Sequence, residues 1–268
     1  MTTCPPVFIE GIALWAPTLP GWPIARAAFR GEGAPVEPPA RRPAPELLPP
    51  AERRRAPDTV ALALEVASQA VAQSGWRPAQ LPSVFTSAHG DLATTDAMCR
   101  TLASAPTLLS PTRFHNSVHN AASGYWGIAT GCMQPSTALS AFECSFAAGL
   151  LEALTQSAAD ARPVLLVGHD TAACGALVST NASRGLLGAA LVLAPQRSAR
   201  SLAALDWSLV SGPSARNPLR SPAALALAGN AMADALPLFE ALACADAAAF
   251  EMPLAATLAL RLRLDTFA

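Results

Sequence analysis

Apolar residues fall along the chain in short runs, separated by longer segments with helical spacing. The runs with the length and composition of buried strands are Val7–Leu14, Pro82–Ser87, Pro163–Gly168 and Gly188–Ala194. Between the first two, Thr59–Ser74 has the composition of a helix, with Asp58 as an N-cap and Gly75 as a C-terminal stop. Alternation of helices and short apolar strands predicts a layered α/β fold.

The stretch Gln134–Leu154 combines a strand, an abrupt bend and a helix. Ser136–Ser140 is β-friendly, small residues follow, and an apolar helical segment ends at Leu154. This geometry lifts one side chain out of a core at a helix N-terminus, where the helix dipole favours an anion. Either Ala141 or Cys144 can occupy that position, and only the cysteine could act as a nucleophile.

The remaining segments have less regular patterns. Residues Pro17–Pro57 are rich in Pro, Arg, Gly and Ala and predict a long surface excursion. Helices are expected at Thr94–Ala103, His119–Ala129 and Ala223–Leu242, and strands at Leu202–Val210 and Leu254–Leu264. The change of rhythm at Gln196 suggests a main domain over residues 1–195 and an extension over residues 196–268 packed on it.

The composition is unusually apolar, with 51% hydrophobic and 14% charged residues. The longest apolar region, Ala223–Phe250, is interrupted by polar residues and a proline, so no transmembrane segment is predicted. The first residues lack the basic start of a signal peptide. We therefore expect a soluble, cytoplasmic protein with an apolar interface.

The formal net charge of −1 gives no general attraction to nucleic acid. Arginines cluster at Arg41-Arg42 and Arg53-Arg54-Arg55. A solvated loop is the simpler interpretation of this cluster, and binding of phosphate or of a carrier protein is the alternative.

The six cysteines are scattered without a CxxC pair, which favours reduced thiols and no zinc site. Cys144 near a helix N-terminus could be a nucleophile, but Glu143 beside it opposes a thiolate, and an inert buried thiol is the simpler interpretation.

His115 and His119 are spaced to share a helix face, yet no third ligand suggests a metal, and no cofactor motif is present. His89 follows a strand, and His169-Asp170 follows another, which favours hydrogen-bonding roles beside a site.

Taken in order, these segments resemble the N-terminal half of a β-ketoacyl synthase of the thiolase superfamily. The motifs that carry the resemblance over about residues 5–195 are FTSAHG, HNAASGYWGIATG, STALSA, PVLLVGHD and GLLGAALVLA. The resemblance implies a thiolase-like fold: a mixed central sheet flanked by helices, one half of a ketosynthase plus a short C-terminal α/β extension.

The departures from the family concern its chemistry. Counted back from Gly149, the family's nucleophilic cysteine falls on Ala141, which has no nucleophilic atom. The family also uses two histidines from its C-terminal half, and no histidine follows His169 here. When catalytic groups act as a unit, removing one of them abolishes most of the rate of the reaction. We therefore do not expect this chain alone to catalyse the condensation.

The resemblance therefore implies a chain-length-factor type of subunit, as in aryl polyene and xanthomonadin-like pathways. Such a subunit pairs with an active β-ketoacyl synthase, shapes its acyl tunnel, and meets the acyl carrier protein indirectly. Partner-facing residues would come from Gly127–Leu139 and the helix starting near Phe142. The candidate interface or tunnel residues are Met133, Phe142, Phe146, His119 and Asn120, with core packing as the alternative for the first three.

Two other functions stay open. The chain could be an acyltransferase or thioesterase that uses Cys144, with His89 or His119 as its base. It could also be a homodimer that binds and sequesters acyl chains.

Overall fold

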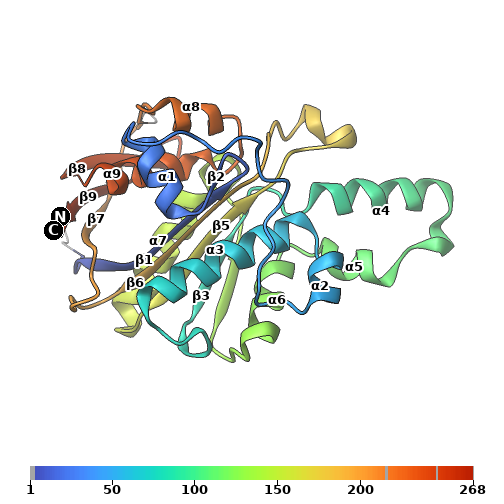
Figure 1. The fold of residues 1–268 in the computed structure, drawn as a ribbon, viewed down its shortest axis with the longest axis horizontal. Coiled ribbons are helices and arrows are strands. Elements are labelled where there is room, and N and C mark those ends of the chain that lie inside the picture. The colour runs from blue at the N-terminus through green and yellow to red at the C-terminus, as the bar shows by residue number, and fades with distance from the viewer. Residues whose placement is uncertain (1–3, 215–216, 246, 268) are drawn as a thin grey trace.

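The structure, a computed structural model, describes residues 4–214, 217–245 and 247–267. Within these ranges nine strands form one sheet in the order β4-β3-β5-β6-β1-β7-β9-β8, with β2 paired to β1 (Figure 1). β3 runs parallel to β4 and β5, and the other neighbours are antiparallel. The layered α/β fold predicted from the sequence is confirmed.

The strands are β1 (Val7–Ala16), β2 (Leu19–Pro20), β3 (Ser83–Thr86), β4 (Ser136–Leu139), β5 (Val164–Asp170), β6 (Leu187–Ala194), β7 (Ala203–Ser211), β8 (Ala248–Ala255) and β9 (Leu258–Thr266). The helices are α1 (Trp22–Phe29), α2 (Pro50–Arg55), α3 (Asp58–Ser74), α4 (Leu92–Ser104), α5 (Pro111–Ser117), α6 (Ala121–Thr130), α7 (Ser145–Asp160), α8 (Pro222–Leu227) and α9 (Leu236–Cys244). Among the described residues, no helix is long and apolar enough to cross a bilayer.

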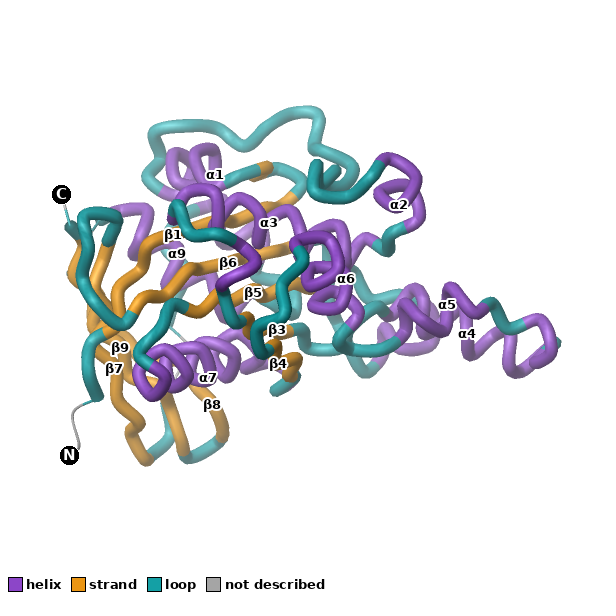
Figure 2. The backbone as a smooth tube through the Cα atoms, turned by 90° about the horizontal axis from the view of Figure 1, so that it is seen from below, coloured by secondary structure: helices purple, strands orange, loops and turns teal. Residues whose placement is uncertain are grey.

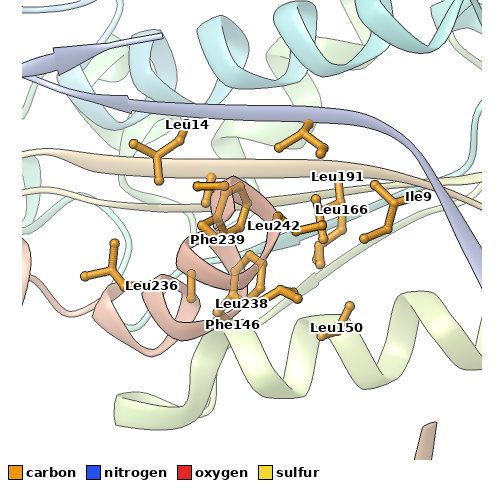
Figure 3. Close-up of a cluster of buried hydrophobic side chains, with 14 of the residues drawn as sticks. Ile9, Leu14, Phe146, Leu150, Leu166, Leu191, Leu236, Leu238, Phe239 and Leu242 are labelled. Atoms are coloured by element: carbon orange, nitrogen blue, oxygen red, sulfur yellow. The ribbon is translucent and has the colours of Figure 1, made fainter. Parts of the chain in front are cut away.

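The central strands are buried on both faces, so their residues alternate between two apolar clusters. In β5, Val164 and Leu166 belong to the cluster that packs on α1, α7 and α9, while Leu165 and Val167 belong to the cluster under α3 and α6. Figure 3 shows the first cluster, where Phe146 and Phe239 meet edge to face. Burial on both faces explains why these strands read as continuous apolar runs rather than as alternating ones.

The helix predicted over Thr59–Ser74 is α3, and Gly75 ends it in the left-handed conformation with φ of 70°. The N-cap differs from the prediction. Pro57 takes that position, and Asp58 is the first helical residue. Its carboxylate lies 3.4 Å from the Nε of Arg42 instead of accepting a hydrogen bond from the helix backbone.

The prediction of a single helix over Ala223–Leu242 is wrong. The chain instead forms α8 and α9, with an irregular segment between them. Asn230 interrupts the helix. Its amide nitrogen donates to the carbonyl of Arg184 at 2.9 Å, and its oxygen accepts from the N–H of Met232 at 2.9 Å. A side chain that captures backbone groups in this way competes with helical hydrogen bonds.

The strand expected over Leu254–Leu264 contains a turn. The alternating part is β9, but Ala256 and Thr257 reverse the chain, and residues before them form β8, which was not predicted. β7, β8 and β9 continue the sheet formed by earlier residues, as an extension on the same body. The division at residue 195 stays a prediction.

A helical arm formed by α4, α5 and the chain between them projects from the sheet (Figures 1 and 2). Only Leu92 and Asp96 of α4 are buried. Large apolar side chains are exposed along and just after the arm, namely Leu102, Leu108, Phe114 and Val118. An apolar surface on a projecting arm is typical of a segment that packs against another chain.

α7 lies close to the sheet at Gly149. A Cβ atom added there would lie 2.8 Å from Cγ2 of Thr86 and 3.2 Å from Cδ1 of Leu166. A Cβ atom added at Gly124 in α6 would instead point into open space, with nothing within 4 Å of it. The two glycines are therefore matched for helix propensity and differ in packing.

We predict that Gly149→Ala lowers the free energy of unfolding by about 1–3 kcal/mol, because overpacking outweighs the gain in helix propensity. Gly124→Ala should raise it by up to about 1 kcal/mol. Urea unfolding of the isolated chain measures both. Equal shifts for the two variants would contradict the close approach of α7.

Candidate functional site

The bend between β4 and α7 is a tight turn held by one hydroxyl group. Ser145 Oγ accepts from the N–H of Ala141 at 3.0 Å and donates to the carbonyl of Phe142 at 2.7 Å. Thr86 of β3 donates to the carbonyl of Ser145 at 2.7 Å, which ties the turn to the neighbouring strand. The strand, bend and helix predicted from the sequence are present.

Phe142 occupies the strained position of this bend, with φ of 52°. Non-glycine residues rarely adopt this conformation, and where they do the surrounding structure must impose it. Ala141 precedes it and Cys144 is the N-cap of α7. The side chain presented by the strained residue is therefore a phenyl ring, 54% exposed, rather than a thiol.

Cys144 lies in a different hollow from the histidines. It lines a pocket of 150 Å³ together with Glu143 and with Glu251, which is ion-paired to Arg261 at 2.8 Å, and no histidine is among the described lining residues. His119 Nε2 instead lies 3.0 Å from the carbonyl of Ser87. His89 belongs to a neighbouring pocket of 230 Å³ that Phe142 also lines.

A buried polar cluster lies where β3 and β5 end, because the carboxyl ends of parallel strands meet at one edge of a sheet. Asp170 is fully buried and accepts hydrogen bonds from Ser87 Oγ at 2.7 Å and the N–H of Ala88 at 2.8 Å. His89 Nδ1 lies 3.4 Å from the same carboxylate. The hydrogen-bonding role expected at this strand end is therefore observed for Asp170.

This cluster has no nucleophile in a catalytic arrangement. In a serine–histidine–aspartate triad the hydroxyl group donates to the histidine, whereas Ser87 donates directly to Asp170. The network fastens the loop after β3 to the end of β5. His89 Nε2 is buried, and no hydrogen-bond partner for it exists among the described residues.

His169 points into the core, where its ring packs edge to face on Phe85. Burial lowers the pKa of His169 to about 3, and the charges of His119 and His89 act in the same direction. Burial raises the pKa of Asp170, against the opposing effects of His89 and the two hydrogen bonds. His169 is therefore neutral at physiological pH.

His115 and His119 do not share a helix face, because α5 ends at Ser117 and His119 lies in the following loop. His115 instead meets the ring of Tyr125. In residues 4–214, 217–245 and 247–267, no group of three or more His, Cys, Asp or Glu residues is arranged to hold a metal.

The residues expected at an interface fall into two groups. Met133 is 93% exposed, and His119 and Asn120 line a hollow of 560 Å³ beside β4. Phe146, in contrast, is fully buried against Phe239, as the alternative of core packing predicts. Ile128, 81% exposed, was not singled out from the sequence, although it lies within the range expected to face a partner.

Comparison with known proteins is consistent with this geometry. The family of the β-ketoacyl synthase N-terminal domain matches residues 29–243. The chain therefore belongs to the β-ketoacyl synthase family, as the sequence motifs indicated. No match is found among curated protein sequences.

Solved structures share the fold. A ketosynthase (ApeO) in complex with its chain length factor (ApeC) from Xenorhabdus doucetiae gives a TM-score of 0.72 at 22% identity, over 99% of this chain and 100% of the matched chain. The ishigamide ketosynthase/chain length factor gives 0.74 at 15% identity, over 98% and 100%. The type II polyketide synthase complex AntDE:AntF, an acyl-carrier protein with its ketosynthase bound to the hexaketide, gives 0.77 at 11% identity, over 98% and 100%. The predicted thiolase-like fold is confirmed.

We predict that the free energy of unfolding falls as the pH drops from about 6.5 towards 3, because the unfolded chain binds a proton that buried His169 excludes. The contribution is about 1.4 kcal/mol per pH unit. Asp170 acts in the opposite direction, since its raised pKa favours the folded state at low pH.

Comparison of variants separates the two contributions. His169→Asn should flatten the pH dependence of unfolding, measured by urea titration at several pH values. His115→Asn is the matched control, because His115 is exposed. Identical slopes for His169→Asn and the unmodified protein would contradict the assignment.

Proposed function

We propose that this chain is a non-catalytic, chain-length-factor-like subunit that pairs with an active β-ketoacyl-acyl-carrier-protein synthase. The observation that carries the proposal is the bend after β4. It has the strand, turn and helix of a nucleophile site, but the side chains of Ala141 and Phe142 are hydrocarbon only. Register from Gly149 matches Ala141 to the family's nucleophile, and the strained residue is Phe142. Neither side chain can form a thioester.

The exposed edge of the sheet supports pairing with a second chain. β4 is an edge strand, hydrogen-bonded only to β3 within the described part of the sheet. An unprotected edge beside exposed apolar residues is costly in a free protein and suits strand addition. Ile128 and Met133 both lie in the chain just before this edge strand, and we infer that they are in the interface with the partner.

We call the bend between β4 and α7, residues 140–144, the elbow, and the function we infer for it is steric. Half-exposed Phe142 would narrow or close the acyl tunnel at the subunit boundary, and this sets how far a growing chain can extend. The neighbours that contain a ketosynthase with a chain length factor support such a pairing. We further propose that the acyl chains are carrier-bound polyene intermediates of an aryl polyene or xanthomonadin-like pathway.

Interface variants test the pairing. Tagged chain co-expressed with a β-ketoacyl-acyl-carrier-protein synthase from the same source should retain that partner on affinity and size-exclusion chromatography. Met133→Lys and Ile128→Lys should each weaken the complex by about tenfold or more, because each buries a charge at an apolar contact. Leu225→Lys is the matched control, since Leu225 is 55% exposed on α8 and lies outside the ranges expected to face the partner.

A soluble monomer with no affinity for any ketosynthase would overturn the proposal. Loss of the complex in Leu225→Lys to the same extent would show that the lysine variants act through solubility instead.

The alternative function, an acyltransferase or thioesterase, requires Cys144 as its nucleophile, whereas the proposed function does not. We predict that Cys144→Ala leaves the condensation rate of the complex unchanged within about twofold, because the thiol takes no part in the chemistry. Incubation with an activated acyl thioester, followed by mass spectrometry, should show no acyl adduct on this chain. A Cys144 adduct together with loss of activity in Cys144→Ala would establish the enzyme.

A further inference from the structure

A second hollow, of 660 Å³, lies between α2, the base of the arm and the end of β5, and shares no lining residue with the pocket at the elbow. Its polar wall includes Arg55, Thr94, Thr112, Arg113 and Asn116. The basic cluster Arg53-Arg54-Arg55 thus contributes Arg55 to this pocket, and α5 contributes Arg113.

The two guanidinium groups are available to a ligand. Arg55 on α2 and Arg113 on α5 are both exposed, and neither side chain has a hydrogen bond or ion pair with any residue that the structure describes. Two other arginines of the cluster are engaged. Arg42 donates to the carbonyl of Ala56 at 3.0 Å, and Arg53 donates to that of Leu48 at 3.0 Å.

Asn116 adds a fixed donor in the wall. Its side chain is more than nine-tenths buried, and its Oδ1 accepts a hydrogen bond from the hydroxyl of Tyr125 at 3.1 Å. This bond sets the orientation of the amide, so that Nδ2 is the free end. In the described part of the chain Nδ2 has no acceptor, and the residue lines the pocket.

The carboxylates in the wall are already occupied. Asp58 pairs with Arg42 at 3.4 Å. Asp91 accepts from the N–H of Thr94 at 2.6 Å and from the hydroxyl of Thr59 at 2.8 Å. The charge of Asp58 is therefore compensated by Arg42, while Asp91 keeps its negative charge, and the two guanidinium groups of Arg55 and Arg113 leave the wall net positive.

We propose that this pocket binds a phosphate group. Guanidinium groups match phosphate oxygens in a bidentate geometry, and the amide of Asn116 and the threonine hydroxyls supply neutral donors around them. The volume exceeds that of one phosphate, so the group can be inorganic or part of a phosphorylated organic molecule. The inference does not rest on the proposed function, since no residue of the elbow or of β4 takes part.

Calorimetric titration of the full chain with inorganic phosphate, pyrophosphate and adenosine diphosphate tests the proposal at low ionic strength. Saturable binding of pyrophosphate that weakens with added salt is expected. Tighter binding of the nucleotide than of pyrophosphate would assign the site to a phosphorylated organic molecule, and the reverse would assign it to the inorganic anion.

Variants locate the site. Arg113→Gln and Asn116→Asp should each weaken pyrophosphate binding by about tenfold or more, because the first removes a charged donor and the second replaces an amide donor with a negative charge. The aspartate keeps an acceptor for Tyr125, so the wall is preserved. Arg54→Gln is the matched control, since this exposed arginine of α2 lies outside the pocket lining, and it should change binding by less than about twofold.

Two results would overturn the proposal. One is the absence of saturable binding of all three ligands to the unmodified chain. The other is equal weakening by Arg54→Gln and Arg113→Gln, which would show attraction to general surface charge. Should Asn116→Asp fail to fold, judged by circular dichroism, the arginine pair alone decides between these outcomes.

Discussion

Burial of β5, β6 and β1 on both faces is the constraint on which the rest of the structure depends. With apolar side chains packed on helices above and below, these strands cannot carry exposed polar groups along their length. Apart from Glu10 in β1, the charged and histidine side chains of these three strands lie at the end of β5, where Asp170 is 3.4 Å from Nδ1 of His89. The same packing requires α7 to approach the sheet closely at Gly149, and this approach sets where the elbow points.

The geometry of the elbow is held by groups other than a nucleophile. The hydroxyl of Ser145 fixes the turn through Ala141 and Phe142 and does not depend on a nucleophile at either position. A strained backbone residue is kept only when its surroundings impose it. The residue in that position is Phe142, and its half-exposed phenyl ring is the group on which the proposed steric role rests.

The surface divides into two kinds of unpartnered feature. The edge of β4 and the arm expose apolar residues and backbone groups, and these features suit another protein chain. The pocket between α2 and α5 exposes guanidinium groups and an oriented amide, and these suit a small anion. The pocket shares α5 with the arm but has no lining residue in β4, so the pocket and the edge of β4 can be altered separately.

The sequence by itself determined the fold class, the family and most elements, because these follow from local periodicity and from motif order. The helix at α3, the strand at β5 and the bend before α7 were predicted correctly, while the cap at Asp58 and the break at Asn230 were not. Both errors concern side chains whose partners, Arg42 and the carbonyl of Arg184, lie elsewhere in the chain. Only the tertiary structure decided that Phe146 is core, that Phe142 holds the strained position, and that Arg55 and Arg113 share one pocket. Those outcomes depend on contacts between distant segments, which local spacing does not encode.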